Sequence, residues 1–199
     1  MPSKASETAK ATKKSAVAAP AALLEALSTA LTDAALHGEE HGFEGAYRTE
    51  ATAFVAGTMM KRKAGEPAIA LETLTPTSGH RTMQLAVIND DMPFLVDSIA
   101  TTVAATGLGV DRILHPVLSV RRDNAGELTQ ILDGHPSGEK RESVIYMEID
   151  RADAKQRTEL VAAIKATLAE VRAAVRAWAK MPETLAAAAD RIADVEGAA

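Results

Sequence analysis

The spacing of apolar residues changes in the middle of the chain, on either side of a short polar turn. They first alternate with other residues, as in a β-strand, and then recur at steps of three and four, as in an α-helix. The strand pattern is carried by Met83, Leu85 and Val87, and the helix pattern by Met92, Val96, Ile99 and Val103. Asp90, Asp91 and Pro93 lie at the change, and these residue types begin helices, because a carboxylate accepts first-turn N–H groups and proline has no N–H to lose. The pattern therefore predicts a strand and a helix joined by a tight turn, with Gly107 as the helix stop.

Similar patterns predict further elements before this unit. Residues 23–36 place five leucines mostly on one helical face, with Gly38 as the stop. A second, weaker helix is predicted over residues 45–60. Residues 69–73 alternate as in a strand, and the proline and glycine of residues 76–79 predict a turn.

Beyond Gly107 the pattern predicts another strand. Leu114, Leu118 and Val120 share one side of it, and Ser119 lies on the other side. Pro116 lacks the N–H that a ladder requires, so we place it at an edge, a bulge or an unpaired position.

The rest of the chain predicts a hairpin, a strand and a long helix. The turn at residues 123–126 leads into a strand at 128–132, and residues 145–149 form a strand with three apolar residues on one face. A helix follows, and Pro182 ends or kinks it. Its apolar stripe is Val161, Ile164, Leu168, Val171, Val175 and Trp178, and its outer face is Lys165, Glu170, Arg172 and Arg176.

This order of elements predicts the α+β class, as a two-layer sandwich with an N-terminal helical extension. Two helices are expected to cover one face of a mostly antiparallel sheet. The residues expected on that covered face include Leu85, Val87, Leu118 and Ile149.

The chain divides into four predicted parts. Residues 1–20 hold almost no bulky apolar side chains and predict a disordered tail. Its lysines allow a transit peptide or a polyanion contact as the less favoured alternatives. Residues 21–65 form a helical extension, residues 66–180 the α+β domain, and residues 181–199 a helical linker.

Composition excludes several classes of function. The net charge of −5 disfavours a surface that binds nucleic acid. Since there are no cysteines, disulfides and thiolate chemistry are excluded. No apolar run is long enough to indicate a membrane span or a signal peptide, so a soluble cytoplasmic protein is expected.

An ordered set of motifs resembles the N-terminal region of the large bacterial NAD-specific glutamate dehydrogenases, from about residue 23 to residue 194. The motifs are Ile88 to Ser98, Gly107-Leu108, His115-Pro116-Val117-Leu118, Val120 to Asp123 and Tyr146 to Arg151. The resemblance implies an ACT-like module with a ferredoxin-like fold, ahead of the catalytic domain. It also implies a homo-oligomeric parent enzyme that oxidises L-glutamate with NAD to 2-oxoglutarate and ammonia.

The chain itself lacks the Gly-rich fingerprint of a dinucleotide site, since Gly107-Leu108-Gly109 has no third glycine or following helix. We therefore predict no catalytic, cofactor-binding or metal-binding residues here, and NAD only in the parent enzyme. Whether the chain is a fragment or a free-standing relative stays open.

The strand-to-helix turn is the candidate regulatory or interface site, and its residues are Asn89, Asp90, Asp91, Met92, Pro93 and Phe94. Related ACT domains often bind an amino acid at a D-x-P-G-L-like sequence in this place. Here Phe94 stands where that sequence has glycine, which disfavours an effector and favours packing or assembly. A site shared between two facing turns stays open.

Other polar residues allow two interpretations each. Asp90, Asp91 and Asp97 fit acid/base or metal chemistry, but we favour helix capping by Asp90 or Asp91. For His115 and His135 we favour a surface or edge position over a metal ligand. The charged run Arg121-Arg122-Asp123 is expected to be a solvated strand end, with an anion contact as the alternative.

Three functions are considered. The favoured one is a non-catalytic regulatory and assembly module of a large NAD-dependent glutamate dehydrogenase, whose partners are the remaining domains or further copies. The alternative is a free-standing amino-acid-sensing module. An independent enzyme is least supported, because no nucleophile pair, metal cluster or cofactor motif is present in the sequence. The effector, the allosteric sign and the number of subunits are not determined by the sequence.

Overall fold

The structure is a computed structural model that describes residues 20–35, 42–74 and 82–197. The predicted tail, apart from its last residue Pro20, lies outside the described residues, as do the helix stop at Gly38 and the turn at 76–79.

The described residues form an α+β fold in the predicted order, with one additional strand. The helices are α1 (Ala21–Asp33), α2 (Gly45–Met59), α3 (Leu95–Ala105) and α4 (Ala154–Gly197). The strands are β1 (Ala68–Leu74), β2 (Thr82–Asp90), β3 (Val110–Leu114), β4 (Val117–Arg122), β5 (Leu128–Leu132) and β6 (Lys140–Ile149).

The strands make one antiparallel sheet in the order β1-β2-β6-β4-β5, and β3 pairs with β6 beyond the end of β4. The single strand predicted through residues 114–120 is therefore two strands. They separate at Pro116, which cannot donate to the ladder, although its carbonyl accepts the Val144 N–H at 2.9 Å. Pro116 thus occupies the unpaired position that we predicted.

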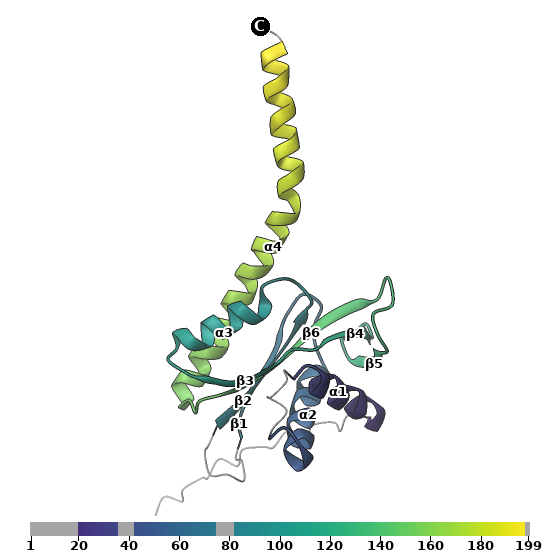
Figure 1. The fold of residues 1–199 in the computed structure, drawn as a ribbon, viewed down its shortest axis with the longest axis vertical. Helices are drawn as coiled ribbons and strands as arrows, with labels where there is room; N and C mark the ends of the chain where they lie inside the picture. The colour runs from purple at the N-terminus through teal and green to yellow at the C-terminus, as the bar shows by residue number, and fades with distance from the viewer. Residues whose placement is uncertain (1–19, 36–41, 75–81, 198–199) are drawn as a thin grey trace, which may run out of the picture.

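Helices cover both faces of this sheet (Figure 1). α3 and α4 pack over one face, and α1 and α2 pack over the other. Because side chains alternate along a strand, β2 sends Leu85 and Val87 towards α3 and α4, and Ala86 and Ile88 towards α2. The predicted α+β, ACT-like architecture is confirmed, and the N-terminal helical extension packs on the second face.

One predicted face assignment is wrong. Leu118 belongs with α1 and α2, whereas Leu85, Val87 and Ile149 lie beneath α3 and α4. Leu118 pairs directly with Glu142 of β6, and directly paired residues point to the same side of a sheet. The proline break hid this register from the sequence pattern.

The long helix α4 begins with a reciprocal cap. The Asp153 carboxylate accepts the Gln156 N–H at 2.8 Å, and the Gln156 side-chain oxygen accepts the Asp153 N–H at 2.9 Å. Leu160, Ile164 and Leu168 then pack on the sheet.

The second half of α4 extends away from the sheet and its other helices (Figure 1). The expectation that the apolar stripe packs as far as Trp178 is wrong, because Trp178 is exposed. Pro182 lies inside α4 and does not end it, so of the two alternatives only a kink remains. None of the described helices, α4 included, combines the length and the apolar character that a membrane span requires.

Candidate functional site

The candidate turn lies where β2 ends, at Asp90, and α3 begins, at Leu95. Asn89 is buried, Met92 is partly buried, and Pro93 and Phe94 are exposed. Charged side chains from three distant segments reach the end of β2 beside it, and they are Arg62, Glu142 and Arg172.

The predicted capping of α3 by Asp90 or Asp91 is wrong. The N-cap of α3 is Phe94, which makes no side-chain cap hydrogen bond. The Asp90 carboxylate binds two arginines instead, and the Asp91 carboxylate accepts the Ser143 hydroxyl at 3.1 Å. Asp97 lies in the first turn of α3, where a negative charge suits the helix dipole.

Phe94 has the backbone conformation of a glycine. Its φ is 70°, in the left-handed region that a bulky side chain rarely adopts and glycine adopts readily. Its ring is 62% exposed, so the prediction that it packs is wrong within a single chain. The residue that precedes α3, Phe94, therefore has a strained backbone and an exposed phenyl ring.

A buried ion cluster lies beside this turn, centred on Glu142, whose side chain is only 2% exposed. Arg122 binds both carboxylate oxygens of Glu142, each at 2.8 Å. Arg62 donates to the Glu142 Oε1 through Nε at 3.0 Å and Nη2 at 2.7 Å. The Arg122 contact, in which two N–H groups bind two different oxygens, is the strong form of arginine–carboxylate contact.

Asp90 extends this cluster to α4. Asp90 and Glu142 are directly opposite on β2 and β6, an arrangement that repels unless a cation lies between them. Arg62 supplies that cation, since its Nη2 also lies 2.6 Å from Asp90 Oδ1. Arg172 of α4 donates to Asp90 Oδ2 at 2.9 Å and to Asn89 Oδ1 at 2.8 Å. One chain of charges thus joins the sheet, the segment after α2 and the long helix.

The cluster stays ionised at neutral pH. Burial opposes the charge on Glu142, but hydrogen bonds from Arg122 and Arg62 outweigh it and hold the pKa of Glu142 below its usual value. Burial likewise opposes the charge on Asp90, and Arg62 and Arg172 nevertheless lower its pKa. These carboxylates therefore act as fixed acceptors and not as proton donors.

Gly126 fixes Arg62 in place. The Arg62 N–H donates to the Gly126 carbonyl at 3.0 Å, and Arg122 Nη1 donates to the same carbonyl at 2.9 Å. A Cβ on Gly126 would lie 2.4 Å from the Arg62 carbonyl oxygen, and the φ of Gly126 is +81°. The predicted hairpin turn is confirmed, and the Asp123 carboxylate closes it by accepting the N–H groups of Ala125 and Glu127, each at 2.9 Å.

The charged run at the end of β4 divides between two environments. Arg121 is exposed and pairs with Glu139, as expected of a solvated strand end. Arg122 is not solvated, because its side chain is largely buried against Glu142. The solvated interpretation is therefore correct for Arg121 and wrong for Arg122.

His115 lies in a short polar chain with two partners. Its Nε2 is 3.1 Å from the Ser143 hydroxyl, which donates to Asp91. Serine lies between histidine and aspartate, whereas nucleophilic catalysis requires histidine in the middle to take the serine proton. Burial lowers the pKa of His115, although Asp91 opposes the shift. This arrangement is suited to holding the turn against β6.

His135 has a different partner, which belongs to β4. Its Nδ1 lies 3.2 Å from the Ser119 hydroxyl. Ser119 is on the side of β4 opposite Leu118, as predicted, but it is buried, so that side is not simply a solvent face.

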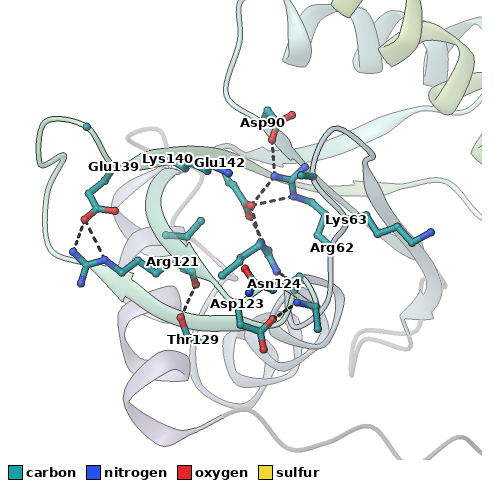
Figure 2. A pocket seen from close by; sticks show the side chains of 16 residues that line it. Arg62, Lys63, Asp90, Arg121, Asp123, Asn124, Thr129, Glu139, Lys140 and Glu142 are labelled. Carbon is teal, nitrogen blue, oxygen red and sulfur yellow. Dashed lines mark hydrogen bonds and ion pairs between the residues drawn. The ribbon is translucent and has the colours of Figure 1, made fainter.

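An open groove of about 760 Å³ runs along the ion cluster and the β4–β5 hairpin. Figure 2 shows Arg62 facing Glu142 beneath Asp90, with Lys63 extending away from them. Arg121 and Glu139 lie at the opposite end, so the groove wall carries both signs of charge. Among the described residues, no cluster of three or more His, Asp or Glu side chains is arranged to hold a metal ion.

The sequence pattern indicates little of this cluster. It places Arg172 on an outer helix face and singles out neither Arg62 nor Glu142. One signal was available, because Glu142 shares the side of β6 with Val144 and Tyr146, and a charge on a buried face requires a partner. The identity of that partner depends on contacts 80 residues apart.

Known proteins resemble this chain over the same region. Residues 48–164 match the family described as glutamate dehydrogenase, ACT1 domain. The chain is 41% identical over 92 residues to an NAD-specific glutamate dehydrogenase of Pseudomonas aeruginosa, and 37% identical over 94 residues to one of Halomonas elongata. These alignments cover 45% and 46% of this chain but only 6% of each relative. No solved structure gave a significant match.

The family match covers more than half of the chain. It begins in α2, includes all the strands named above and ends in α4. The matched region therefore holds the sheet, the candidate turn and the ion cluster around Glu142, apart from Arg172. On this evidence the chain belongs to the glutamate dehydrogenase ACT1 domain family.

Proposed function

We propose that this chain is a non-catalytic regulatory and assembly module of a larger NAD-dependent glutamate dehydrogenase. The observation that carries the proposal is the ACT1 family match, together with the 6% share of the related dehydrogenases that the chain aligns with. In the parent enzyme L-glutamate and NAD would give 2-oxoglutarate and ammonia, with NAD bound by other domains. Residues 66–180 would be the module, 21–65 its helical extension and 181–199 a linker, in a cytoplasmic protein.

The site supports a regulatory role through its connections. Asp90 at the turn is bound to Arg172, so the position of α4 is linked directly to the end of β2. Arg62 and Glu142 carry the same contact into the sheet. A chain of fixed charges that runs from Arg172 on α4 through Asp90 to the buried Glu142 is suited to linking the position of a helix to that of a turn.

Assays of the purified chain test the non-catalytic part of the proposal. We expect no NADH formation from L-glutamate and NAD, because hydride transfer requires a bound and oriented nicotinamide. Formation of NADH above that of a matched preparation without the protein would overturn it.

The parent polypeptide tests the regulatory part. The reading frame that carries this domain should encode dehydrogenase domains, in the same chain or in an adjacent partner. In that enzyme, Arg172→Ala should alter subunit assembly or the response to effectors and leave the turnover of the saturated enzyme nearly unchanged. Lys165→Ala, on the same helix but without a contact to Asp90, is the matched control. Loss of turnover in Arg172→Ala with unchanged assembly would instead indicate a role in catalysis.

Amino-acid sensing is the second candidate, and the groove favours it. A zwitterionic ligand suits a groove that presents Arg121 and Lys140 as well as Asp123 and Glu139. A ligand that binds the folded state raises the melting temperature in a saturable manner. Thermal melts with glutamate, aspartate and other amino acids therefore separate the two functions, since an assembly module should show no saturable shift. Arg121→Ala should remove any shift that arises from this groove.

A further inference from the structure

The exposed half of α4 carries most of the uncovered large apolar surface. Among the described residues, five large apolar side chains are exposed. Four of them lie on this helix beyond the body, which is the sheet together with α1, α2, α3 and the part of α4 that packs on it. They are Trp178 at 70%, Met181 at 51%, Leu185 at 63% and Ile192 at 62% exposure. Figure 1 shows this half of α4 standing clear of the sheet and of every other helix.

These residues follow a seven-residue repeat. Trp178, Leu185 and Ile192 are seven apart, and Met181 lies three after Trp178, which gives alternating steps of three and four with Ala188 completing the row. Such a repeat is the seam of a coiled coil. Ile164, which is buried on the sheet, lies two repeats before Trp178, so the seam continues the packed stripe of α4 past the point where the body ends.

A solitary helix with this composition is not stable in water. Helical stability in proteins comes mainly from packing of an apolar face, and this face has no covering among the described residues. Pro182 also removes one intrahelical hydrogen bond within the exposed half. The seam therefore requires a partner helix.

The charges along this segment favour an identical helix in the opposite direction. Arg176 and Lys180 lie at its beginning, whereas towards its end the acidic residues Asp190, Asp194 and Glu196 outnumber the one basic residue, Arg191. Antiparallel pairing sets the basic beginning of one helix beside the acidic end of the other, whereas parallel pairing sets like charges side by side. It also lets Met181 face Ile192, and Leu185 face Ala188, in both halves of a symmetric pair.

The apolar area is sufficient for a reversible pair. A fully buried large side chain removes roughly 100 Å² from water, and the tryptophan removes more, so four from each helix with their flanking alanines bury on the order of 1,000 Å². That total is at the lower limit for specific interfaces. We infer that the exposed half of α4 is a dimerisation helix that pairs in antiparallel orientation with the same segment of a second copy of this chain.

The single tryptophan reports on this pairing directly. As the concentration of the full chain is raised, sedimentation should show the mass rising from 20.9 kDa towards twice that value, and the Trp178 emission should shift to shorter wavelength together with it. A chain that stays monomeric with an unshifted emission up to about 200 μM, where weak interfaces associate, would overturn the inference and place the partner of the seam on another protein.

Charge substitutions separate the seam from a general charge effect. Met181→Glu combined with Leu185→Glu should abolish the rise in mass and the emission shift. The control, Ala179→Glu combined with Ala186→Glu, adds the same charge outside the seam and should keep both. Equal loss in the two variants would contradict the seam, and circular dichroism with melting of the body checks that both variants are folded.

The absence of cysteine allows the orientation to be measured with spin labels. Labels at Ala186→Cys lie near the centre of an antiparallel pair and should be close along its axis, whereas labels at Ala179→Cys should be about 22 Å apart along it, at 1.5 Å per residue. Equal label distances at the two positions would indicate a parallel pair and overturn the proposed orientation.

Discussion

The two faces of the sheet are built from different chemistry. Beneath α3 and α4 the core is made of aliphatic and methionine side chains from β2, β6 and the helices. Beneath α1 and α2 the core includes buried charges and phenol groups. There Arg112 lies 2.9 Å from Glu148 and over the ring of Phe43, and the Tyr146 hydroxyl lies 3.5 Å from Glu148. The first face is specified by apolar periodicity, and the second also requires matched polar partners.

Protonation differs between the two faces for the same reason. On the polar face, burial raises the pKa of Tyr146, and the negative charge of Glu148 adds to this shift. Burial and a hydrogen bond with Glu148 raise the pKa of Tyr47 in the same way. Both phenols therefore stay protonated and serve as hydrogen-bond donors in the core.

The largest expected effect breaks the polar face at Glu142. Glu142→Ala leaves Arg62 and Arg122 buried without their carboxylate, which should lower the free energy of unfolding by about 3 to 5 kcal/mol. Urea denaturation measures the change. Glu139→Ala removes the carboxylate of an exposed ion pair and should change little, because water screens that pair. Equal losses would mean that the buried cluster contributes nothing beyond a surface pair.

A second test asks whether both faces belong to one cooperative unit. Leu27 of α1 and Ile149 of β6 are both fully buried, on opposite faces. Replacing either with Ala should cost about 2 to 5 kcal/mol of global stability through lost burial and a cavity. If α1 and α2 formed a separable extension, Leu27→Ala would accelerate hydrogen exchange in those helices and leave the urea midpoint of the sheet unchanged.

The acid sensitivity of the protein should come from the ion cluster around Glu142 and from His115. Glu142, Asp90 and His115 all have folded-state pKa values below their usual ones, so each stabilises the folded state above its unfolded pKa and loses that contribution as the pH falls through the folded pKa. Stability should decline first below about pH 6.5, from His115, and more steeply below about pH 4.3, from the carboxylates.

Urea midpoints at several pH values measure this decline. His115→Gln should flatten the first part of the curve and Asp90→Asn the second. An unchanged profile in both variants would assign the acid sensitivity to other groups.

The smallest expected effect concerns Phe94. Phe94→Gly relieves the left-handed backbone but adds freedom to the unfolded chain, so it should stabilise the protein by at most about 1 kcal/mol. Phe94→Ala keeps the strain and should be nearly neutral, since the ring is mostly exposed. Thermal melts of the two variants measure the difference, and a large loss in Phe94→Ala would show that the ring is packed, for example between subunits.

Local patterns in the sequence were sufficient for the elements that depend on neighbours. The alternation around Leu85 and the helical spacing around Ile99 predicted β2 and α3, and residues 123–126 predicted the hairpin. The side occupied by Leu118 could not be predicted, because it depends on pairing with Glu142 across a proline break. The same holds for the candidate site, since Asp90 looks like a helix cap until Arg172, 82 residues away, is seen to bind it.

The central position of β6 has a consequence for how the protein is made. β6 pairs with β2 on one side and with β3 and β4 on the other, yet among the described strands of this sheet it is the last to leave the ribosome. The hairpins β1–β2 and β4–β5 are local and can form early, but they are joined only when β6 arrives. Until then their inner edges are open to pairing with other chains. Completion of the sheet is therefore a late, long-range step in synthesis.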